Sequence, residues 1–174
     1  MTLTLLTGGA RSGKSALAVH RARRTGTPVV FVATGQARDA EMADRISRHR
    51  AERPEGWTTV EAPLELVAAV TALPPDRTVV VDCLSLWVSN LLERGDDEQV
   101  VTTQAGELAR WGAAYPGTVV VVTNEVGLGL VPMHPVSRDY RDRLGRVNAL
   151  VAASADLAQL VVAGRTLTLD PVED

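Results

Sequence analysis

Cysteine, lysine and aromatic side chains are all scarce in this sequence. With Cys83 as the only cysteine, the chain can form neither an intramolecular disulfide nor a cysteine metal cluster. Aromatic residues make up 3% of the chain and hydrophobic residues 45%, so Val, Leu and Ala must fill the interior. The net charge of −3 lacks the basic surplus of nucleic-acid-binding proteins, and we expect no nucleic-acid partner.

Long apolar runs are also missing. No stretch reaches the length of a membrane span. The apolar run at the N-terminus has no basic segment before it and is too short for a signal peptide, so we expect a cytoplasmic protein. The length of 174 residues predicts one domain, residues 1–174, with a substantial core.

The scarcity of lysine points to one position. Lys14 is the only lysine among 18 lysine and arginine residues, so we expect it to stand where arginine cannot replace it. Residues 8–15 read GGARSGKS and match G-x-x-x-x-G-K-[ST], a loop whose backbone N–H groups bind nucleotide phosphates. A compact ammonium fits between phosphate oxygens better than a broad guanidinium does.

The surroundings of this loop support the motif. Residues 2–6 are predicted to form a buried strand, and apolar residues at helical spacing predict a helix over 16–24. A strand, a glycine-rich loop and a helix in this order are the setting of a phosphate-binding loop. The alternative interpretation is an ordinary glycine-rich turn between a strand and a helix, which this combination of motif and context disfavours.

Strand and helix patterns alternate through the rest of the chain. Strands are predicted at residues 29–33, 57–61, 78–82 and 119–122, with a C-terminal hairpin at 157–162 and 166–169. Helices are predicted at residues 40–53, 64–73, 84–92, 98–114 and 137–154. Continuous valine runs separated by helices predict an α/β fold with a mostly parallel sheet covered on both faces, and the hairpin adds an antiparallel edge.

Ligands of such sheets bind at the carboxyl ends of the strands. Asp82 ends a valine-rich strand, and together with the loop hydroxyl of Ser15 it fits the usual pair of Mg²⁺ ligands in phosphoryl transfer. Two alternatives stay open here. Asp82 could instead cap the following helix, and Glu125, which also follows a valine strand, competes for the metal-side or base role.

Among the three histidines, His20 and His134 are expected to be surface residues. His49 differs because four arginines accompany it in the segment 44–54: Arg45, Arg48, Arg50 and Arg53. One interpretation is a solvated, charged helix face. The other is a triphosphate site beside a nitrogen nucleophile, in which the cations favour the neutral imidazole.

Several strings of residues together resemble one family, the bifunctional adenosylcobinamide kinase/adenosylcobinamide-phosphate guanylyltransferases of cobalamin biosynthesis. The similarity extends over essentially the whole chain, and T-N-E-V-G and G-R-V-N are its most specific parts. The matching segments are 7–15, 33–34, 39–54, 122–127, 131–132, 141–142 and 145–148.

The resemblance implies a RecA-like P-loop fold, a trimer and a two-step enzyme. Such an enzyme uses ATP or GTP with Mg²⁺ to phosphorylate adenosylcobinamide, and then transfers GMP from GTP through a guanylylated histidine. The matching histidine is His49, which joins Lys14 of the loop motif as a candidate catalytic residue, while Ser15 and Asp82 remain the candidate metal ligands. The implied nucleotide contacts are Gly8, Gly9, Ala10, Arg11, Ser12, Gly13, Lys14, Ser15, Thr34, Gly35, Gln36, Arg50, Ala51, Glu52, Arg53, Glu61 and Asp82.

Two other classes remain compatible with the residues alone. A small-molecule P-loop kinase explains Lys14 and Asp82 but leaves His49 without a role. A non-catalytic nucleotide-binding module requires the histidine helix to be only an exposed face. A switch GTPase is disfavoured, because its N-K-x-D string needs a second lysine.

Overall fold

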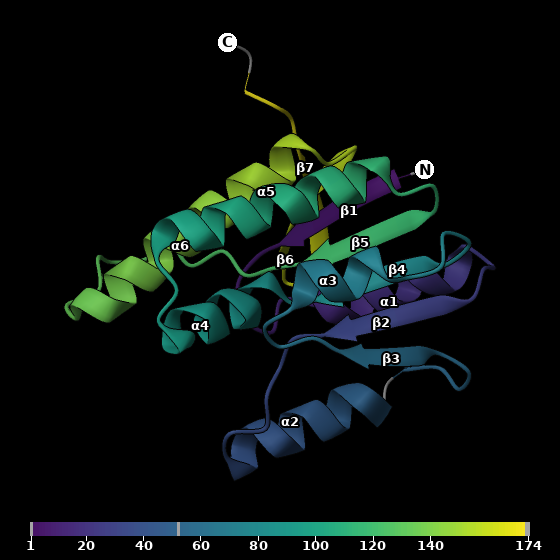
Figure 1. The fold of residues 1–174 in the computed structure, drawn as a ribbon, viewed down its shortest axis with the longest axis horizontal. Helices are drawn as coiled ribbons and strands as arrows, with labels where there is room; N and C mark the ends of the chain where they lie inside the picture. Colours follow the sequence, from purple (N-terminus) through teal and green to yellow (C-terminus); the bar gives the residue numbers. More distant parts are fainter. Residues whose placement is uncertain (1, 52, 173–174) are drawn as a thin grey trace.

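A seven-stranded sheet forms the centre of the computed structural model, which describes residues 2–51 and 53–172 (Figure 1). The strands are β1 (Thr2–Thr7), β2 (Val29–Ala33), β3 (Thr58–Glu61), β4 (Thr78–Asp82), β5 (Thr118–Val122), β6 (Leu157–Val162) and β7 (Arg165–Leu169). The helices are α1 (Lys14–Arg24), α2 (Ala40–Ala51), α3 (Leu66–Thr71), α4 (Leu84–Arg94), α5 (Glu98–Ala114) and α6 (Pro135–Ala153).

The strand order is β3-β2-β4-β5-β1-β6-β7. All neighbours pair in parallel except β7, which runs antiparallel to β6. This confirms the predicted mostly parallel sheet and its C-terminal hairpin. Because β5 lies between β1 and β4, the segment that follows β5 separates the glycine-rich loop from Asp82.

Valine supplies most of the sheet interior, as the low aromatic content requires. Along β4, Val79 and Val81 pack into one cluster of buried side chains, whereas Val80 packs into the other. Successive side chains of a strand point to opposite faces, so an uninterrupted valine run buries both faces of the sheet. This is the pattern of a parallel strand covered on both sides.

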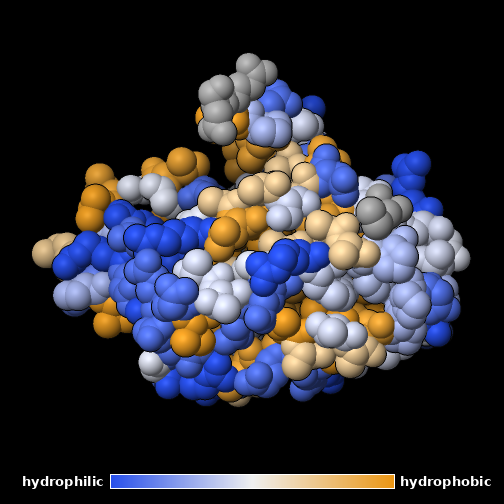
Figure 2. Space-filling view, turned by 45° about the horizontal axis from the view of Figure 1, so that its top comes forward, coloured by the Kyte–Doolittle hydropathy of each residue, from blue (hydrophilic) through white to orange (hydrophobic). Residues whose placement is uncertain are grey.

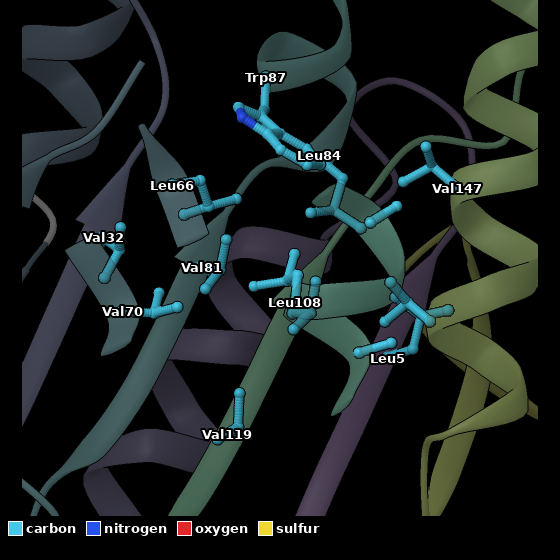
Figure 3. Packing of buried hydrophobic residues seen from close by; sticks show 14 of the residues in the cluster. Leu5, Val32, Leu66, Val70, Val81, Leu84, Trp87, Leu108, Val119 and Val147 are labelled. Carbon is cyan, nitrogen blue, oxygen red and sulfur yellow. The ribbon is translucent and has the colours of Figure 1, made fainter. Parts of the chain in front are cut away.

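The larger cluster lies between the sheet and helices α3, α4, α5 and α6, and Figure 3 shows part of it. Trp87 is its largest fully buried side chain. Its indole Nε1–H donates a hydrogen bond to the Leu64 carbonyl at 2.9 Å, so the polar atom of this buried ring is satisfied. The smaller cluster lies under α1, where Ala18 and Ala22 contact the opposite face.

Helix α2 stands apart from both clusters. Figure 1 shows it beyond the β3 edge of the sheet, and none of its described residues is buried.

Of the six helices in the described ranges, only α5 has the predicted boundaries; the differences at α1, α3 and α6 have local explanations. Helix α3 is limited to Leu66–Thr71, and prolines stand on both sides of it, at Pro63 and Pro74. Helix α6 begins two residues early, because Pro135 occupies its first turn, where a missing N–H costs nothing. Helix α1 already begins at Lys14. Within residues 2–51 and 53–172, no helix is long and apolar enough to cross a membrane.

Candidate active site

The glycine-rich loop connects β1 to α1 and depends on two glycines. Gly8 has φ +145°, and a Cβ there would stand 2.2 Å from the Val161 carbonyl oxygen of β6. Gly13, at the N-cap of α1, has φ +103° and no side-chain cap. Both conformations strain any L side chain. The first N–H groups of α1 are therefore left without a capping side chain at the end of the loop, an arrangement suited to a phosphate.

Lys14 is almost fully buried, with 6% of its surface exposed. Its Nζ donates to the carbonyl oxygens of Gly8 at 2.9 Å and Gly9 at 2.6 Å, and to Ser12 Oγ at 3.3 Å. Burial lowers the pKa of this ammonium, an effect that the nearby carboxylate of Asp82 opposes. The cation is thus held inside the curl of the loop by neutral acceptors.

Two other segments fix the position of the loop. The Gly164 N–H, in the turn of the C-terminal hairpin, donates to the Ser12 carbonyl at 2.9 Å. On the other side, the Glu125 N–H donates to the Gly8 carbonyl at 3.1 Å. The Gly8 oxygen therefore accepts from both Lys14 and the segment that follows β5.

Two adjoining pockets open at the carboxyl ends of the strands. The larger, of about 380 Å³, is lined by the loop residues 11–16, by α2 and by Asn124. The smaller, of about 70 Å³, is lined by α2, by the ends of β2 and β3 and by Leu86. Five residues line both pockets: Ser15, Arg45, His49, Asp82 and Cys83.

Helix α2 contributes to both pockets through two neighbouring stripes. Glu41, Arg45 and Arg48 line the larger pocket, at the i, i+4, i+7 spacing of one helix face. Met42, Ile46 and Arg50 follow one or two positions later and line the smaller pocket. His49 lies between the two stripes and is half-buried. The predicted grouping of His49 with arginines therefore exists, and its members face pockets rather than only solvent.

The smaller pocket combines cations with an apolar wall. The Arg53 guanidinium lies 3.7 Å from the centroid of the Phe31 ring, a favourable cation–π contact. Its Nη1 donates to Thr59 Oγ1 at 3.0 Å, its Nε has no hydrogen-bond partner, and burial lowers its pKa. Glu61 accepts from Arg50 Nη2 at 2.6 Å. A planar ligand with polar edges fits this chemistry.

Asp82 is the last residue of β4 and lines both pockets. The N-cap position of α4 is Cys83, not Asp82, so the carboxylate is not a helix cap. Asp82 forms none of the ion pairs found in the described part of the chain. The neighbouring Cys83 is a neutral thiol, because burial raises its pKa to about 11.

Residues 34–36, the turn after β2, have three different environments. Thr34 is fully buried; its hydroxyl donates to the Cys83 carbonyl at 2.7 Å and accepts from the Cys83 N–H at 2.9 Å. It therefore positions the end of β4. Gly35 lines the smaller pocket, and Gln36 accepts from Arg38 Nη2 at 2.8 Å.

The other sequence-predicted residues are distributed unevenly. Arg11, Ser12, Gly13, Lys14 and Ser15 line the larger pocket, whereas Gly8, Gly9 and Ala10 shape the loop without lining either pocket. Ala51 is exposed and lines neither, and Glu52 lies outside the described residues. Glu125 turns its carboxylate to the Gly127 N–H at 2.6 Å. His20 and His134 are exposed and line neither pocket.

Sequence reasoning gave no role to two residues that the structure brings to the site. Phe31 lines the smaller pocket from β2; as an apolar residue within a strand it gave no functional signal. Asn124 lines the larger pocket from the end of β5. Its position after a valine strand was visible in the sequence, but its partners on α4 and α6 were not.

The described part of the protein offers only one or two oxygen ligands for Mg²⁺ here, so a bound phosphate and water would have to complete the coordination shell. No group of three or more His, Cys, Asp or Glu residues that could hold a metal occurs in the described ranges. Ser15 and Asp82 supply a hydroxyl and a carboxylate to the same pockets. Mg²⁺ usually takes one or two protein oxygens and completes its shell with phosphate and water, so these two residues match that mode.

Comparison with known structures agrees on the fold. A protein of Pyrococcus horikoshii shares it at a TM-score of 0.59 and 11% identity, covering 99% of this chain and 88% of that chain. The type III secretion ATPase EscN of enteropathogenic E. coli gives a TM-score of 0.58 at 10% identity, covering 93% of this chain and 43% of that chain. The RecA-like P-loop fold expected from the resemblance is thereby confirmed.

Comparison of sequences is more specific. The bifunctional adenosylcobalamin biosynthesis protein CobP of Pseudomonas aeruginosa is 42% identical, over 95% of this chain and 95% of that protein. The bifunctional adenosylcobalamin biosynthesis protein CobU of Escherichia coli K12 is 40% identical, over 93% of this chain and 96% of that protein. Residues 4–169 match the sequence model of one family. The chain belongs to the cobinamide kinase / cobinamide phosphate guanyltransferase family.

Proposed function

We propose that this bifunctional enzyme phosphorylates adenosylcobinamide with ATP or GTP, and then transfers GMP from GTP to the product through a guanylylated His49. The observation that carries the proposal is the position of His49 in the wall common to the two pockets. One pocket contains the phosphate-binding loop, and the other contains Arg50, Arg53 and Glu61.

The larger pocket suits the kinase reaction. A triphosphate placed along residues 11–16 would meet the N–H groups at the start of α1. Lys14 would exchange its loop acceptors for oxygens of the transferred phosphoryl group. Ser15 and Asp82 would hold Mg²⁺, which when bound neutralises charge on the phosphates. The acceptor hydroxyl attacks the γ-phosphorus, the bond to the β-phosphate oxygen breaks, and the nucleoside diphosphate leaves.

The smaller pocket suits the guanosine end of GTP. The Glu61 carboxylate accepts hydrogen bonds, and a guanine base offers two N–H donors on one edge. Arg53 stacked on Phe31 supplies a flat cationic wall. A GTP molecule bound with its base here would place its α-phosphorus near the common wall that contains His49.

The transfer itself takes two displacements at the same phosphorus. An imidazole nitrogen of His49 attacks the α-phosphorus, the bond to the β-phosphate oxygen breaks, and pyrophosphate leaves. A phosphate oxygen of cobinamide phosphate then attacks the same phosphorus, the P–N bond breaks, and the histidine is released. Splitting one transfer into two steps lowers the barrier of each.

Labelling with α-³²P-GTP tests the histidine intermediate. The wild-type protein should acquire a label that is stable in alkali and lost in acid, as expected for a P–N bond. His49→Ala should take up no label, and its reaction should stop at adenosylcobinamide phosphate, because Lys14, Ser15 and Asp82 remain.

His20→Ala and His134→Ala are the matched controls, since both residues are exposed and line neither pocket. Both should label like the wild type. Full labelling of His49→Ala would refute the proposed intermediate. Loss of both activities in that variant, with an unchanged unfolding temperature, would instead assign His49 to the kinase reaction as well.

A further inference from the structure

The two most specific strings of the sequence, T-N-E-V-G and G-R-V-N, meet in the structure. Thr123 Oγ1 donates to Asn148 Oδ1 at 2.7 Å, and Asn148 Nδ2 donates to the Asn124 carbonyl at 3.0 Å. Asn148 is 9% exposed and Thr123 fully buried. The side-chain amide of Asn148, on α6, therefore binds the side chain of Thr123 and the backbone of Asn124, two successive residues that follow β5.

The same segment is fixed from the side of the phosphate-binding loop. The Thr123 N–H donates to the Leu6 carbonyl at 2.9 Å, and the Glu125 N–H donates to the Gly8 carbonyl at 3.1 Å. The Gly8 oxygen is also the acceptor of Lys14 Nζ. Asn124 thus stands between one residue bound to β1 and one bound to the loop, and the second shares its acceptor with Lys14.

The side chain of Asn124 is oriented by a third contact. Its Nδ2 donates to Ser85 Oγ at 3.0 Å. Ser85 is buried on α4, three residues after Asp82, and its carbonyl accepts from Tyr140 of α6 at 3.2 Å. Asn124 lines the larger pocket together with Lys14, Ser15 and Asp82. Its side-chain amide is held there by Ser85 of α4, and its backbone carbonyl by Asn148 of α6.

We propose that Asn124 contacts the phosphoryl group that moves in the kinase reaction, and that Asn148 is the positioning residue that sets its place. The inference rests on the proposed kinase reaction in the larger pocket. A side-chain amide can turn its N–H to a phosphoryl oxygen, and a preorganised donor stabilises charge that develops in the transition state. The order of strands explains the position, because β5 lies between β1, which leads to Lys14, and β4, which ends in Asp82.

The expected signature is a difference between the two reactions. The γ-phosphoryl group moves in the kinase reaction, whereas guanylylation takes place at the α-phosphorus and releases the other two phosphates together. Asn124→Ala should lower kcat of the kinase reaction with ATP about 100-fold, the scale of losing one preorganised donor. The rate of His49 labelling at saturating GTP should stay within about threefold of the wild type.

Asn148 should act through Asn124, and three variants separate this role from a structural one. Asn148→Ala should lower kcat of the kinase at least about tenfold and change the KM for ATP little. Gln159→Ala is the matched control, because Gln159 is also 9% exposed and hydrogen-bonded, but lies on β6 and lines neither pocket. It should lower the unfolding temperature and leave the kinase kcat unchanged.

Asn148→Asp provides a pH test. Its carboxylate keeps the acceptor for Thr123 but loses the donor to the Asn124 carbonyl. When protonated, the same group regains a donor of nearly the same shape. The kinase rate of Asn148→Asp relative to the wild type should therefore rise as the pH falls from about 8 to about 6, since burial raises a carboxyl pKa.

The measurements distinguish the proposed roles of Asn124 and Asn148 from a purely structural role and from failure of the proposed function. A kinase kcat near the wild-type value in Asn124→Ala would overturn the inference, while normal acid-labile labelling of His49 in the same protein would leave the proposed function intact. Equal losses of kinase and labelling rates in Asn124→Ala and Asn148→Ala would reduce the network to a structural element. A flat pH ratio for Asn148→Asp would remove Asn148 as the positioning residue.

Discussion

Lys14 illustrates how one residue can depend on the geometry of its loop. Its Nζ already has three acceptors, Gly8 O, Gly9 O and Ser12 Oγ, all within the loop. A guanidinium is larger and planar, and it cannot occupy the same small space between carbonyl oxygens. The structure thus gives a physical reason for the single lysine in an arginine-rich sequence.

We expect Lys14→Ala to lower kcat of the kinase reaction at least about 100-fold, because the ammonium stabilises charge on the transferred phosphoryl group. Lys14→Arg should fail to restore it. The measurement is the steady-state rate with ATP and adenosylcobinamide. Arg24→Ala, an exposed residue at the far end of α1, is the control and should keep the wild-type rate. A kinase rate within about threefold of the wild type in Lys14→Ala would contradict the assignment.

At this scale the sequence predicts the groups that carry chemistry better than those that position them. Lys14, Ser15, His49 and Asp82 stand out by motif or by pattern, and all four line the pockets. Thr34, for which the resemblance implies a nucleotide contact, forms hydrogen bonds with the Cys83 backbone that the sequence did not indicate. Residues that position one another, such as Thr34 and Cys83, are far apart in the chain, and a single sequence does not indicate which distant residues are in contact.

Among the helices, α2 is the one with no buried residue in its described part, and it contributes many polar side chains to the pockets. Those in the larger pocket are Glu41, Arg45, Arg48 and His49. Few buried apolar contacts imply a small free energy of local opening. Binding of a triphosphate between α2 and the loop should therefore stabilise the helix, because a ligand that contacts only the closed arrangement favours it.

Hydrogen–deuterium exchange measures this directly. In the free protein, the amides of α2 should exchange much faster than those of α1, which packs its alanines against the sheet. GTP should slow exchange in α2, while the already protected α5 changes little. Equal protection of α1 and α2 without nucleotide would show that contacts other than buried apolar side chains hold α2 in place.

The elements themselves were largely predictable. Valine runs mark β4 and β5, and every predicted helix is present. The strand order was not predictable in detail, because the valine runs are nearly interchangeable and pairing depends on long-range packing. For the same reason the sequence could not show that β5 brings Asn124 between the loop and Asp82.

At the scale of the whole molecule, one segment leaves apolar side chains exposed. Leu128, Leu130 and Met133 are 84%, 97% and 91% exposed, in the loop between β5 and α6. In the view of Figure 2, apolar residues lie at the left end of the molecule, which is the end where Figure 1 places the start of α6. Exposed apolar surface can mark an interaction site, and the trimer implied by the family resemblance stays a prediction.

Sedimentation equilibrium should accordingly give three times the mass of one chain. Leu130→Asp should shift the protein toward smaller species, because burying a carboxylate in an apolar interface is costly. Val100→Asp, which alters a less exposed apolar residue on α5, serves as the comparison and should leave the oligomer unchanged. A wild-type protein that sediments as a single chain would contradict the prediction.

The wall that the two pockets share has a consequence for a population of enzyme molecules. In the proposed mechanism, GMP on His49 would occupy space beside Ser15 and Asp82, which line the same two pockets and which the proposed kinase reaction would also need. A loaded molecule would then be a poor kinase, and it must wait for cobinamide phosphate made by an unloaded one. The two reactions would thus be divided among molecules at any moment, and an excess of GTP would slow the pathway by loading every histidine before any acceptor had been made.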